Sequence, residues 1–347
     1  MSNDNRIDRG QTEYERYAEL YDPEYAEAVR PARRKLPRAK PSVEAVLDEL
    51  TDESYSYEAG LKTTYQPARF EAVWLYDSLR AFYDTGMISD VLAIVKGGKE
   101  ANVYRAQGGK AANAEFVAAK VYRPRAFRNL RNDKMYREGR EVLGGDGKVV
   151  KKNEDRIMRA LGKKTGFGAE VAHTSWLMYE YTTLQHLHAA GAAVPRPLAV
   201  ATNSVLMGYI GDAYRAAPTL HEVRLERPLA RRLFDAVMHN VELMLAADMI
   251  HGDLSAYNIL FWDDEITLID FPQVTNAIGN SHARMILRRD VQRVCDYFAL
   301  QSVQADASAI ADTLWYRFQA RSENDIQADL SRLLAQFTDD EEEPASE

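Results

Sequence analysis

Three polar residues in the second half of the chain have the types and the spacing that phosphoryl transfer requires. Asp253 and Asn258 lie five residues apart in the segment HGDLSAYN (251–258), and Asp270 follows in the context IDF. In phosphoryl transfer one carboxylate accepts the proton of the attacking hydroxyl, while an amide and a second carboxylate hold Mg²⁺ on the phosphates. Such a hard cation prefers a few oxygen ligands, with water and phosphate completing its shell. The tripeptide HGD alone is a weak signal, but together with the later Asn and IDF it predicts a phosphotransfer site.

A glycine-containing segment in the first half of the chain could hold the phosphates themselves. The segment KGGKEANVY (96–104) places a Gly-Gly pair between two strands, where backbone N–H groups can approach phosphate closely. Lys120 lies further on, within an otherwise apolar strand. If the helix that carries Glu180 packs on that strand, Lys120 can pair with Glu180 and contact the α- and β-phosphates. Each feature alone has a simpler explanation, because a Gly-Gly pair also suits an ordinary hairpin and a lone strand lysine is normally exposed.

The periodicity of apolar residues predicts the elements that would position these groups. Helices are expected at 69–85, 174–190, 228–247 and 288–299 and within 305–337, and strands at 90–96, 115–122, 204–210, 259–262 and 266–269. The order glycine loop, Lys, Glu, strand, HxD, Asn and Asp is that of a protein-kinase-like fold. We therefore predict an α+β fold of two lobes, with a β-rich N-lobe and a small helical C-lobe.

Composition and charge divide the chain into regions. Residues 1–66 are predicted to be a largely flexible N-terminal extension, 67–207 the N-lobe, 208–337 the C-lobe and 338–347 an acidic disordered tail. A basic flexible loop is expected near 123–165. Residues 120–164 contain 15 Lys and Arg against 6 Asp and Glu, a net charge of +9 in a chain whose total is −8. This stretch either attracts phosphate, substrate or RNA, or is simply a solvated loop.

The composition also excludes several classes of protein. The 347 residues are 46% hydrophobic and 28% charged, which is typical of a soluble globular protein with two lobes or domains. There is no run of about 18 apolar residues that would predict a membrane helix, and the first residues lack the apolar core of a secretory signal. The single cysteine, Cys295, can form neither an internal disulfide nor, unaided, a thiolate zinc site. These features favour a cytoplasmic protein without membrane contact.

From about residue 69 to residue 300 the sequence resembles the RIO family of atypical serine/threonine protein kinases. The family's glycine loop reads STGKEANVY, where this chain has KGGKEANVY, and LRRDV (287–291) resembles the family's segment after the metal loop. The glycine loop is closer to the first RIO subfamily, whereas HGD (251–253) and DFPQ (270–273) are closer to the second. Nothing like the APE motif follows Asp270, which is a further resemblance to RIO proteins. The resemblance implies a RIO-type kinase fold that lacks the ordinary activation segment.

The resemblance also implies a role for each residue that matches a family motif. Asp253 would be the catalytic carboxylate, assisted by Asp270 and Lys120, and Asn258 and Asp270 would bind Mg²⁺ or Mn²⁺. The residues that would bind ATP are Gly97, Gly98, Lys99, Val103, Lys120, Glu180, Met207, Tyr209 and Ile210. Met207 would be the gatekeeper, and the backbone of residues 208–210 would hold adenine. Because Lys96 and Gly97 replace the Ser and Thr of the family loop, a hydroxyl contact to phosphate is lost.

The family also suggests partners. Its metal-binding aspartate can become phosphorylated, so the resemblance implies an ATP-driven switch as well as a kinase. Its usual setting is maturation of the small ribosomal subunit, where the basic stretch 120–164 would face ribosomal RNA or the pre-ribosome. ATP would be the co-substrate, the protein substrate is not identified by the sequence, and autophosphorylation is one expected reaction.

Two other functions fit part of the pattern. Small-molecule phosphotransferases of the aminoglycoside or choline kinase type resemble this chain in using HGDxxxxN and IDF, with the aspartate activating a substrate hydroxyl. The segment GKEANVY argues against that class, as do the few residues after Asp270, 77 in all. A non-catalytic ATP-binding scaffold would be expected to lack one of the four central polar residues. All four are present: Lys120, Asp253, Asn258 and Asp270.

Overall fold

The computed structural model describes residues 63–123, 136, 138, 140–150, 155–163 and 165–320. All of them belong to one compact unit, Val46–Glu347. Several predicted regions lie outside the described residues: the N-terminal extension up to residue 62, residues 124–135 of the basic stretch, residues 321–337 and the acidic tail 338–347. Within the described ranges, no helix is both long enough and apolar enough to cross a membrane.

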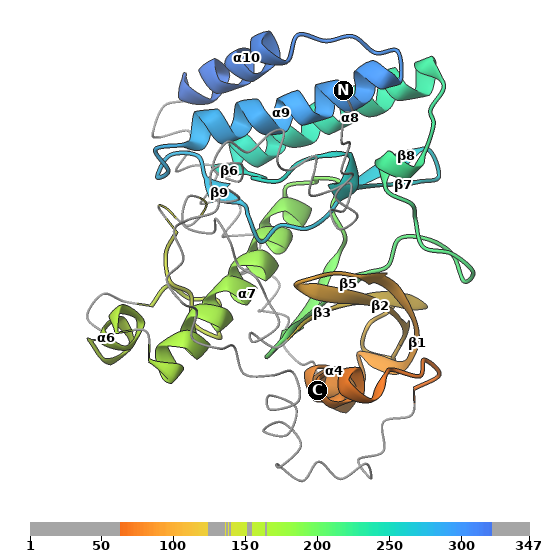
Figure 1. Cartoon of the computed structure of the whole chain (residues 1–347), viewed down its shortest axis with the longest axis vertical. Helices are drawn as coiled ribbons and strands as arrows, with labels where there is room; N and C mark the ends of the chain where they lie inside the picture. The colour runs from red at the N-terminus through yellow and green to blue at the C-terminus, as the bar shows by residue number, and fades with distance from the viewer. Residues whose placement is uncertain are drawn as a thin grey trace, which may run out of the picture. The chain divides into compact units, whose positions relative to one another are not determined.

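The N-lobe is built on a five-stranded antiparallel sheet (Figure 1). Its strands, in the order β1-β2-β3-β5-β4, are β1 (Ile88–Gly97), β2 (Ala101–Gly108), β3 (Phe116–Tyr122), β5 (Ser204–Gly208) and β4 (Pro197–Ala201). The hairpin of β1 and β2 contains the glycine segment. The central strand β3 carries Lys120, which is paired in register with Val103 of β2 and Val205 of β5.

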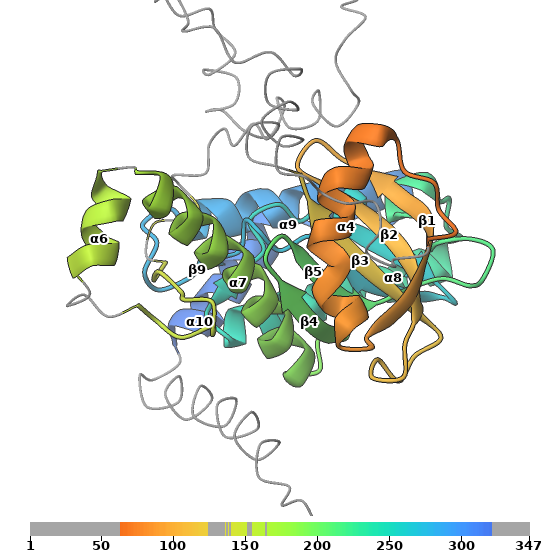
Figure 2. The ribbon, with the colours of Figure 1, turned by 90° about the horizontal axis from the view of Figure 1, so that it is seen from below.

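Helix α4 (Arg69–Asp84) covers one face of this sheet, as Figure 2 shows. Apolar side chains of the helix and the sheet share one buried cluster that includes Leu75, Leu79, Phe82, Ile88, Val91 and Tyr104. Glu71, in the first turn of the helix, accepts a hydrogen bond from the Tyr104 hydroxyl. Successive side chains of a strand point to opposite faces, so Val103 faces away from α4. The face that carries Val103, which the sequence analysis assigns to nucleotide binding, is therefore the face not covered by α4.

Two helices lie in the connection between β3 and β4. α6 (Asp155–Gly162) packs against α7 (Gly166–Ala189), and a Cβ added at Gly168 would lie 2.1 Å from the carbonyl oxygen of Ala160. Thr165 caps α7 by accepting the Gly168 N–H at 3.1 Å. The structure thus differs from the sequence prediction, which had residues 155–162 in a flexible loop and the second helix starting at 174. Glycines are poor helix formers, but here one of them allows the close packing that stabilises both helices.

The C-lobe is mainly helical (Figure 1). Its helices are α8 (Arg227–Ala246), α9 (Ala283–Leu300) and α10 (Ala307–Gln319), which share one buried apolar cluster. Shorter elements are the 3₁₀ turns η2 (Leu220–Glu222) and η3 (Ala256–Asn258) and the strand pairs β6 (Met249–Ile250) with β9 (Thr275–Asn276) and β7 (Ile259–Trp262) with β8 (Glu265–Leu268). The two lobes and the mixture of helices and strands confirm the predicted α+β class. Helix α9 begins five residues earlier than predicted.

The short strands bring the two functional loops together. β6 ends directly before His251, and β8 ends two residues before Asp270. After Asp270 the chain returns to pair β9 with β6, with Ile250 opposite Thr275. We name two loops after their predicted roles: residues 251–258 are the catalytic loop and residues 269–274 are the metal loop. Both loops are anchored on the same strand pair.

Candidate active site

Asp253 and Asn258 contact each other within the catalytic loop. Asn258 donates Nδ2 to the backbone oxygen of Asp253 at 2.8 Å and to its Oδ2 at 3.1 Å. Since the donor atom of the amide is directed at Asp253, its Oδ1 is the atom that can bind a cation. The backbone oxygen of Asn258 accepts the N–H of Ile269 at 3.0 Å, which places the residue before Asp270 beside it. The structure thus brings the three residues predicted for phosphoryl transfer into one site.

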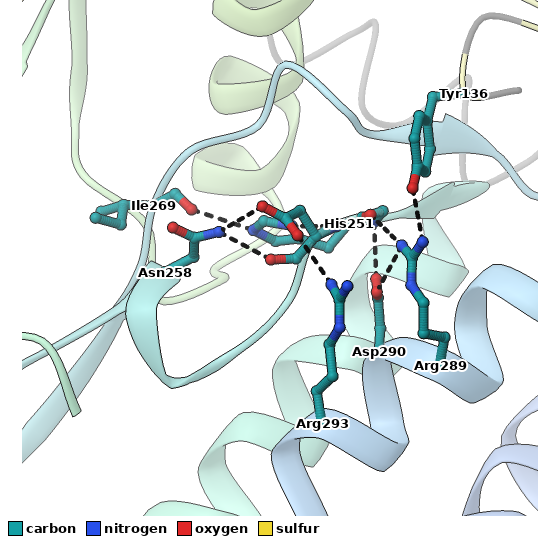
Figure 3. Close-up of polar contacts among 9 residues, drawn as sticks. Tyr136, His251, Asn258, Ile269, Arg289, Asp290 and Arg293 are labelled. Carbon is teal, nitrogen blue, oxygen red and sulfur yellow. Dashed lines mark hydrogen bonds and ion pairs between the residues drawn. The ribbon is translucent and has the colours of Figure 1, made fainter. Parts of the chain in front are cut away.

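Helix α9 holds the catalytic loop at three points, shown in Figure 3. The N–H of Gly252 donates to Asp290 Oδ2 at 2.8 Å, and Arg289 donates to the carbonyl oxygen of Gly252. One turn further along the helix, Arg293 donates Nη1 to Asp253 Oδ1 at 2.8 Å. Both oxygens of the Asp253 carboxylate therefore have a donor, Arg293 on Oδ1 and Asn258 on Oδ2.

Gly252 occupies a position that no other residue suits. Its φ is +80°, in the left-handed region, and a Cβ there would lie 2.2 Å from the carbonyl oxygen of Gln273 in the metal loop. The catalytic and metal loops are therefore in backbone contact at this glycine.

Lys120 connects the N-lobe sheet to the metal loop. Its Nζ lies 2.5 Å from Glu180 Oε1 and 2.6 Å from Asp270 Oδ1, and Glu180 also accepts a hydrogen bond from the Tyr122 hydroxyl. Burial works against the charged form of Lys120, but the carboxylates of Asp270 and Glu180 outweigh it and hold the pKa of Lys120 above its usual value. Desolvation likewise opposes the charged form of Asp270, and Lys120 outweighs it, so the pKa of Asp270 is lowered. Lys120 and Asp270 are both charged at neutral pH.

Asp270 and the residues after it are fixed by backbone geometry and by one arginine. Asp270 has a φ of +71°, a conformation that few residues other than glycine, Asn and Asp adopt. Arg140 donates Nη2 to the carbonyl oxygens of Pro272 at 2.8 Å and Val274 at 2.5 Å. Its guanidinium also lies 4.4 Å from the ring centre of Tyr179, the neighbour of Glu180 on α7. Arg140 therefore joins the metal loop to the helix that carries Glu180.

The residues predicted to contact the nucleotide lie at the glycine hairpin and on β5 and the segment after it. Gly97 ends β1, Lys99 lies in the turn, and the Gly98 N–H donates to Asn102 Oδ1 at 3.3 Å. A Cβ at Gly98 would lie 2.6 Å from the carbonyl oxygen of Ala101, so this tight turn favours glycine.

On the opposite side of β3, Met207 of β5 is paired in register with Ala118. The ring of Tyr209 lies 5.9 Å from the Arg105 guanidinium and 6.2 Å from the ring of Phe116. The carbonyl oxygen of Ile210 accepts the N–H of Ala217 at 3.0 Å. Val103 on β2 and Met207 on β5 therefore lie on the two strands that flank β3, the strand of Lys120.

The donor set suits Mg²⁺ held partly by substrate. In the part of the chain that the structure describes, no group of three or more His, Cys, Asp and Glu side chains could hold a metal ion. A Mg²⁺ ion needs only one or two protein oxygens when phosphate and water complete its octahedron. Asn258 Oδ1 and the carboxylate of Asp270, the two predicted metal ligands, would provide such a pair.

A model of the RIO domain matches residues 102–310 of this sequence. The chain belongs to the RIO domain family. The predicted resemblance is thereby confirmed. The matched part of this RIO chain starts within β2 and contains Lys120, Glu180 and both functional loops.

Several known proteins are similar to this RIO chain. It is 32% identical over 215 residues to the RIO-type serine/threonine-protein kinase Rio1 of Haloferax volcanii, covering 61% of this chain and 64% of that protein. It is 29% identical over 268 residues to the serine/threonine-protein kinase RIO1 of Chaetomium thermophilum, covering 72% of this chain and 47% of that protein. The chain therefore spans less than two thirds of either relative. The crystal structure of the Rio2 kinase-ADP/Mg²⁺-phosphoaspartate complex from Chaetomium thermophilum aligns with a TM-score of 0.47 at 16% identity, covering 84% of each chain.

Sequence reasoning missed the residues of this RIO domain that support the site from other elements. Arg293 and Arg140 contact Asp253 and the metal loop, but neither belongs to a motif with a catalytic meaning. Asp290 lies in the segment LRRDV, which the sequence analysis linked only to the family. One signal could have found Arg293, because a charged residue on the apolar face of a helix is unusual and needs a buried partner.

Proposed function

We propose that this chain is a Mg²⁺- and ATP-dependent RIO-type serine/threonine protein kinase. The observation that carries the proposal is the set of contacts of Lys120, which bridges Glu180 and Asp270 next to the Asp253–Asn258 pair. Membership of the RIO domain family supports it, as do the relatives named serine/threonine-protein kinases.

The N-lobe would hold the triphosphate. The ammonium group of Lys120, kept in place by Glu180, would contact the α- and β-phosphates, and the N–H groups of the glycine hairpin at 97–98 would approach them from the other side. Adenine would lie beside Met207 and the backbone of residues 208–210.

Asn258 and Asp270 would hold the metal. When bound, Mg²⁺ or Mn²⁺ would neutralise part of the charge on the β- and γ-phosphates. The lowered pKa of Asp270 keeps its carboxylate charged and ready for a cation. Asp270 has a positive φ, and the N–H of the preceding Ile269 donates to the Asn258 carbonyl oxygen. Together they fix the direction from which the Asp270 carboxylate would approach the cation.

Asp253 would activate the acceptor. Its carboxylate would accept the proton of a serine or threonine hydroxyl, whose oxygen would form the new bond to the γ-phosphorus as the bond to the β-phosphate oxygen breaks and ADP leaves. Asn258 would keep the carboxylate in position through its bond to Oδ2.

We further infer the setting of this reaction. With water or the Asp270 carboxylate as acceptor, the same site would work as an ATP-driven switch, and transfer to a serine or threonine of the same protein would be autophosphorylation. The net charge of +9 in residues 120–164 supports an anionic partner, for which we propose ribosomal RNA or the pre-ribosome during maturation of the small subunit. The single cysteine, which can form no internal disulfide, supports the cytoplasm.

The test follows γ-labelled ATP and Mg²⁺ with the purified full chain. Label is separated into free phosphate, protein-bound phosphate and small-molecule product, with and without a panel of aminoglycosides and choline. We expect label on protein or as free phosphate, lost in Asp253→Asn and retained in Asp235→Asn, which changes an exposed aspartate on α8. Transfer that occurs only with a small hydroxyl compound would replace the proposal by a small-molecule phosphotransferase. Unchanged turnover in Asp253→Asn would remove the assigned role.

A further inference from the structure

Arg293 contacts the proposed catalytic carboxylate from inside the C-lobe. Its side chain projects from α9, Nη1 lies 2.8 Å from Asp253 Oδ1, and the exposed fractions of the two side chains are only 4% and 14% (Figure 3). Residues on both sides of it on α9, Val291, Val294 and Cys295, are buried in the C-lobe cluster.

A buried arginine at this position is costly for the fold. Removing a guanidinium from water carries a desolvation penalty that can exceed the gain from its ion pair, and a buried pair is often replaceable by apolar residues without loss of stability. The contact of Arg293 with Asp253 is therefore better explained by what it does to the carboxylate than by stability. The guanidinium is always charged and its donors have a fixed planar arrangement, so it restricts the orientation of an acceptor more than lysine does.

The other α9 contacts differ in kind. Arg289 and Asp290 bind the backbone of Gly252 and thus shape the loop, whereas Arg293 binds the side chain that would take the proton. With Asn258 on Oδ2 and Arg293 on Oδ1, rotation of the carboxylate about its own axis is blocked on both sides.

We propose that Arg293 is a positioning residue for phosphotransfer, which holds the Asp253 carboxylate in the one orientation that faces the acceptor hydroxyl. The inference rests on the proposed function, because it assigns Arg293 a part in that reaction. In this proposal Arg293 does not contact the nucleotide. Its replacement should therefore slow the chemical step and leave nucleotide affinity unchanged.

The test compares Arg293→Gln and Arg293→Lys with the wild-type full chain. Arg288→Gln is the matched control, because Arg288 is an exposed arginine on the same helix. For each protein, kcat with Mg²⁺ and γ-labelled ATP, the Kd of the Mg²⁺ complex of a non-hydrolysable ATP analogue, and the thermal midpoint are measured. We expect kcat of Arg293→Gln to fall by about 10- to 100-fold, since small misplacement of a catalytic group costs that much. The Kd should stay within about twofold of the wild-type value, as expected of a loss confined to the chemical step.

Arg293→Lys keeps the positive charge but not the planar guanidinium with its fixed donors. Its kcat should therefore lie between those of Arg293→Gln and wild type. This variant decides the question by itself if Arg293→Gln does not fold. Wild-type kcat in either variant would overturn the inference. So would a parallel loss of kcat, nucleotide affinity and thermal stability, which is what a structural role alone produces. Wild-type protein that transfers no label to protein, water or small molecule would instead overturn the proposed function, and this inference with it.

Discussion

His251 Nε2 lies 3.1 Å from the carbonyl oxygen of Ile269, so one imidazole joins the catalytic loop to the residue before Asp270. Its other ring nitrogen, Nδ1, accepts the N–H of Asp253 at 3.3 Å. Because Nδ1 is an acceptor, Nε2 carries the proton and donates it to Ile269. The ring is 2% exposed and lies 5.1 Å from that of Phe271. A buried imidazole therefore sets the relative position of the two loops that carry the carboxylates.

Replacing this imidazole should damage both loops. In His251→Ala the Ile269 carbonyl and the Asp253 N–H lose their partner, which should lower the free energy of unfolding by about 1 to 3 kcal/mol. We expect kcat to fall at least about tenfold, since the distance between the loops is no longer fixed. His239→Ala, at an exposed histidine of α8, is the control and should resemble wild type. Urea unfolding and steady-state label transfer measure both effects, and a kcat equal to that of the control would refute the linking role of His251.

Two glycines with nearly the same φ allow the effect of a steric contact to be separated from the effect of backbone strain. Gly252 and Gly191 have φ values of +80° and +76°, but a Cβ at Gly191 meets nothing within 4 Å, whereas one at Gly252 would lie 2.2 Å from the Gln273 oxygen. Gly191→Ala should therefore cost about 1 to 2 kcal/mol of stability and no activity. Gly252→Ala should cost more and abolish phosphotransfer, because it displaces the metal loop. Equal loss of stability by urea unfolding, with activity kept in both, would contradict the contact between the loops.

Loss of the Lys120 cation should affect nucleotide binding and stability together. Lys120→Met leaves the buried Glu180 carboxylate and the half-exposed Asp270 carboxylate without their common partner. This should cost about 3 kcal/mol or more of stability and weaken Mg²⁺-ATP binding at least about tenfold. The carboxylates hold the pKa of Lys120 above 10.5, so its charge and its stabilising contribution are complete at lower pH and are lost only as pH rises through that raised value. The stability difference from wild type should thus be constant between pH 7 and about pH 10.

Lys110→Met, at an exposed lysine after β2, is the matched control and should bind nucleotide as wild type does. Calorimetric titration with the nucleotide and thermal unfolding measure the two effects. Equal affinity of the Lys120 and Lys110 variants would remove Lys120 from the phosphate site.

The thiol of Cys295 should be unreactive in the folded protein. Its side chain is 4% exposed, and burial raises the pKa of the thiol from 9.0 to about 11. The neutral thiol therefore stabilises the fold in full below pH 9, and this contribution declines as pH rises toward 11. At pH 8 a disulfide reagent such as DTNB should react roughly 100-fold more slowly with the native protein than with the protein in denaturant, because two pKa units reduce the thiolate fraction by that factor. Rapid, complete labelling of the native protein would contradict the burial of Cys295.

The sequence predicts best those contacts that one loop determines, or that follow once one helix packs on one strand. Asp253 and Asn258 are five residues apart, so their contact follows from a single turn of chain. Lys120 and Glu180 are 60 residues apart, and the sequence predicts their observed pairing on the condition that the helix of Glu180 packs on the apolar strand of Lys120.

Contacts that depend on how separate elements pack could not be predicted in this way. Arg293 lies 40 residues from Asp253 on a helix whose own pattern indicates only a buried face. Its contact depends on the angle at which α9 passes under the catalytic loop, which local propensity does not determine. The sequence does not predict the start of α7 for a related reason, since Gly166 and Gly168 look unfavourable for a helix until Gly168 is seen to lie against α6.

The most direct measurement of the proposed site is a crystal structure of the full chain with Mg²⁺ and a non-hydrolysable ATP analogue. We expect Mg²⁺ at about 2.1 Å from Asn258 Oδ1 and from one carboxylate oxygen of Asp270, with phosphate and water as its other ligands. Lys120 Nζ should lie within hydrogen-bond distance of the α- or β-phosphate, and the Asp253 carboxylate should face the γ-phosphate without touching the metal. A metal bound away from Asn258 and Asp270, or a triphosphate bound away from Lys120, would contradict the assignment of this site to phosphoryl transfer.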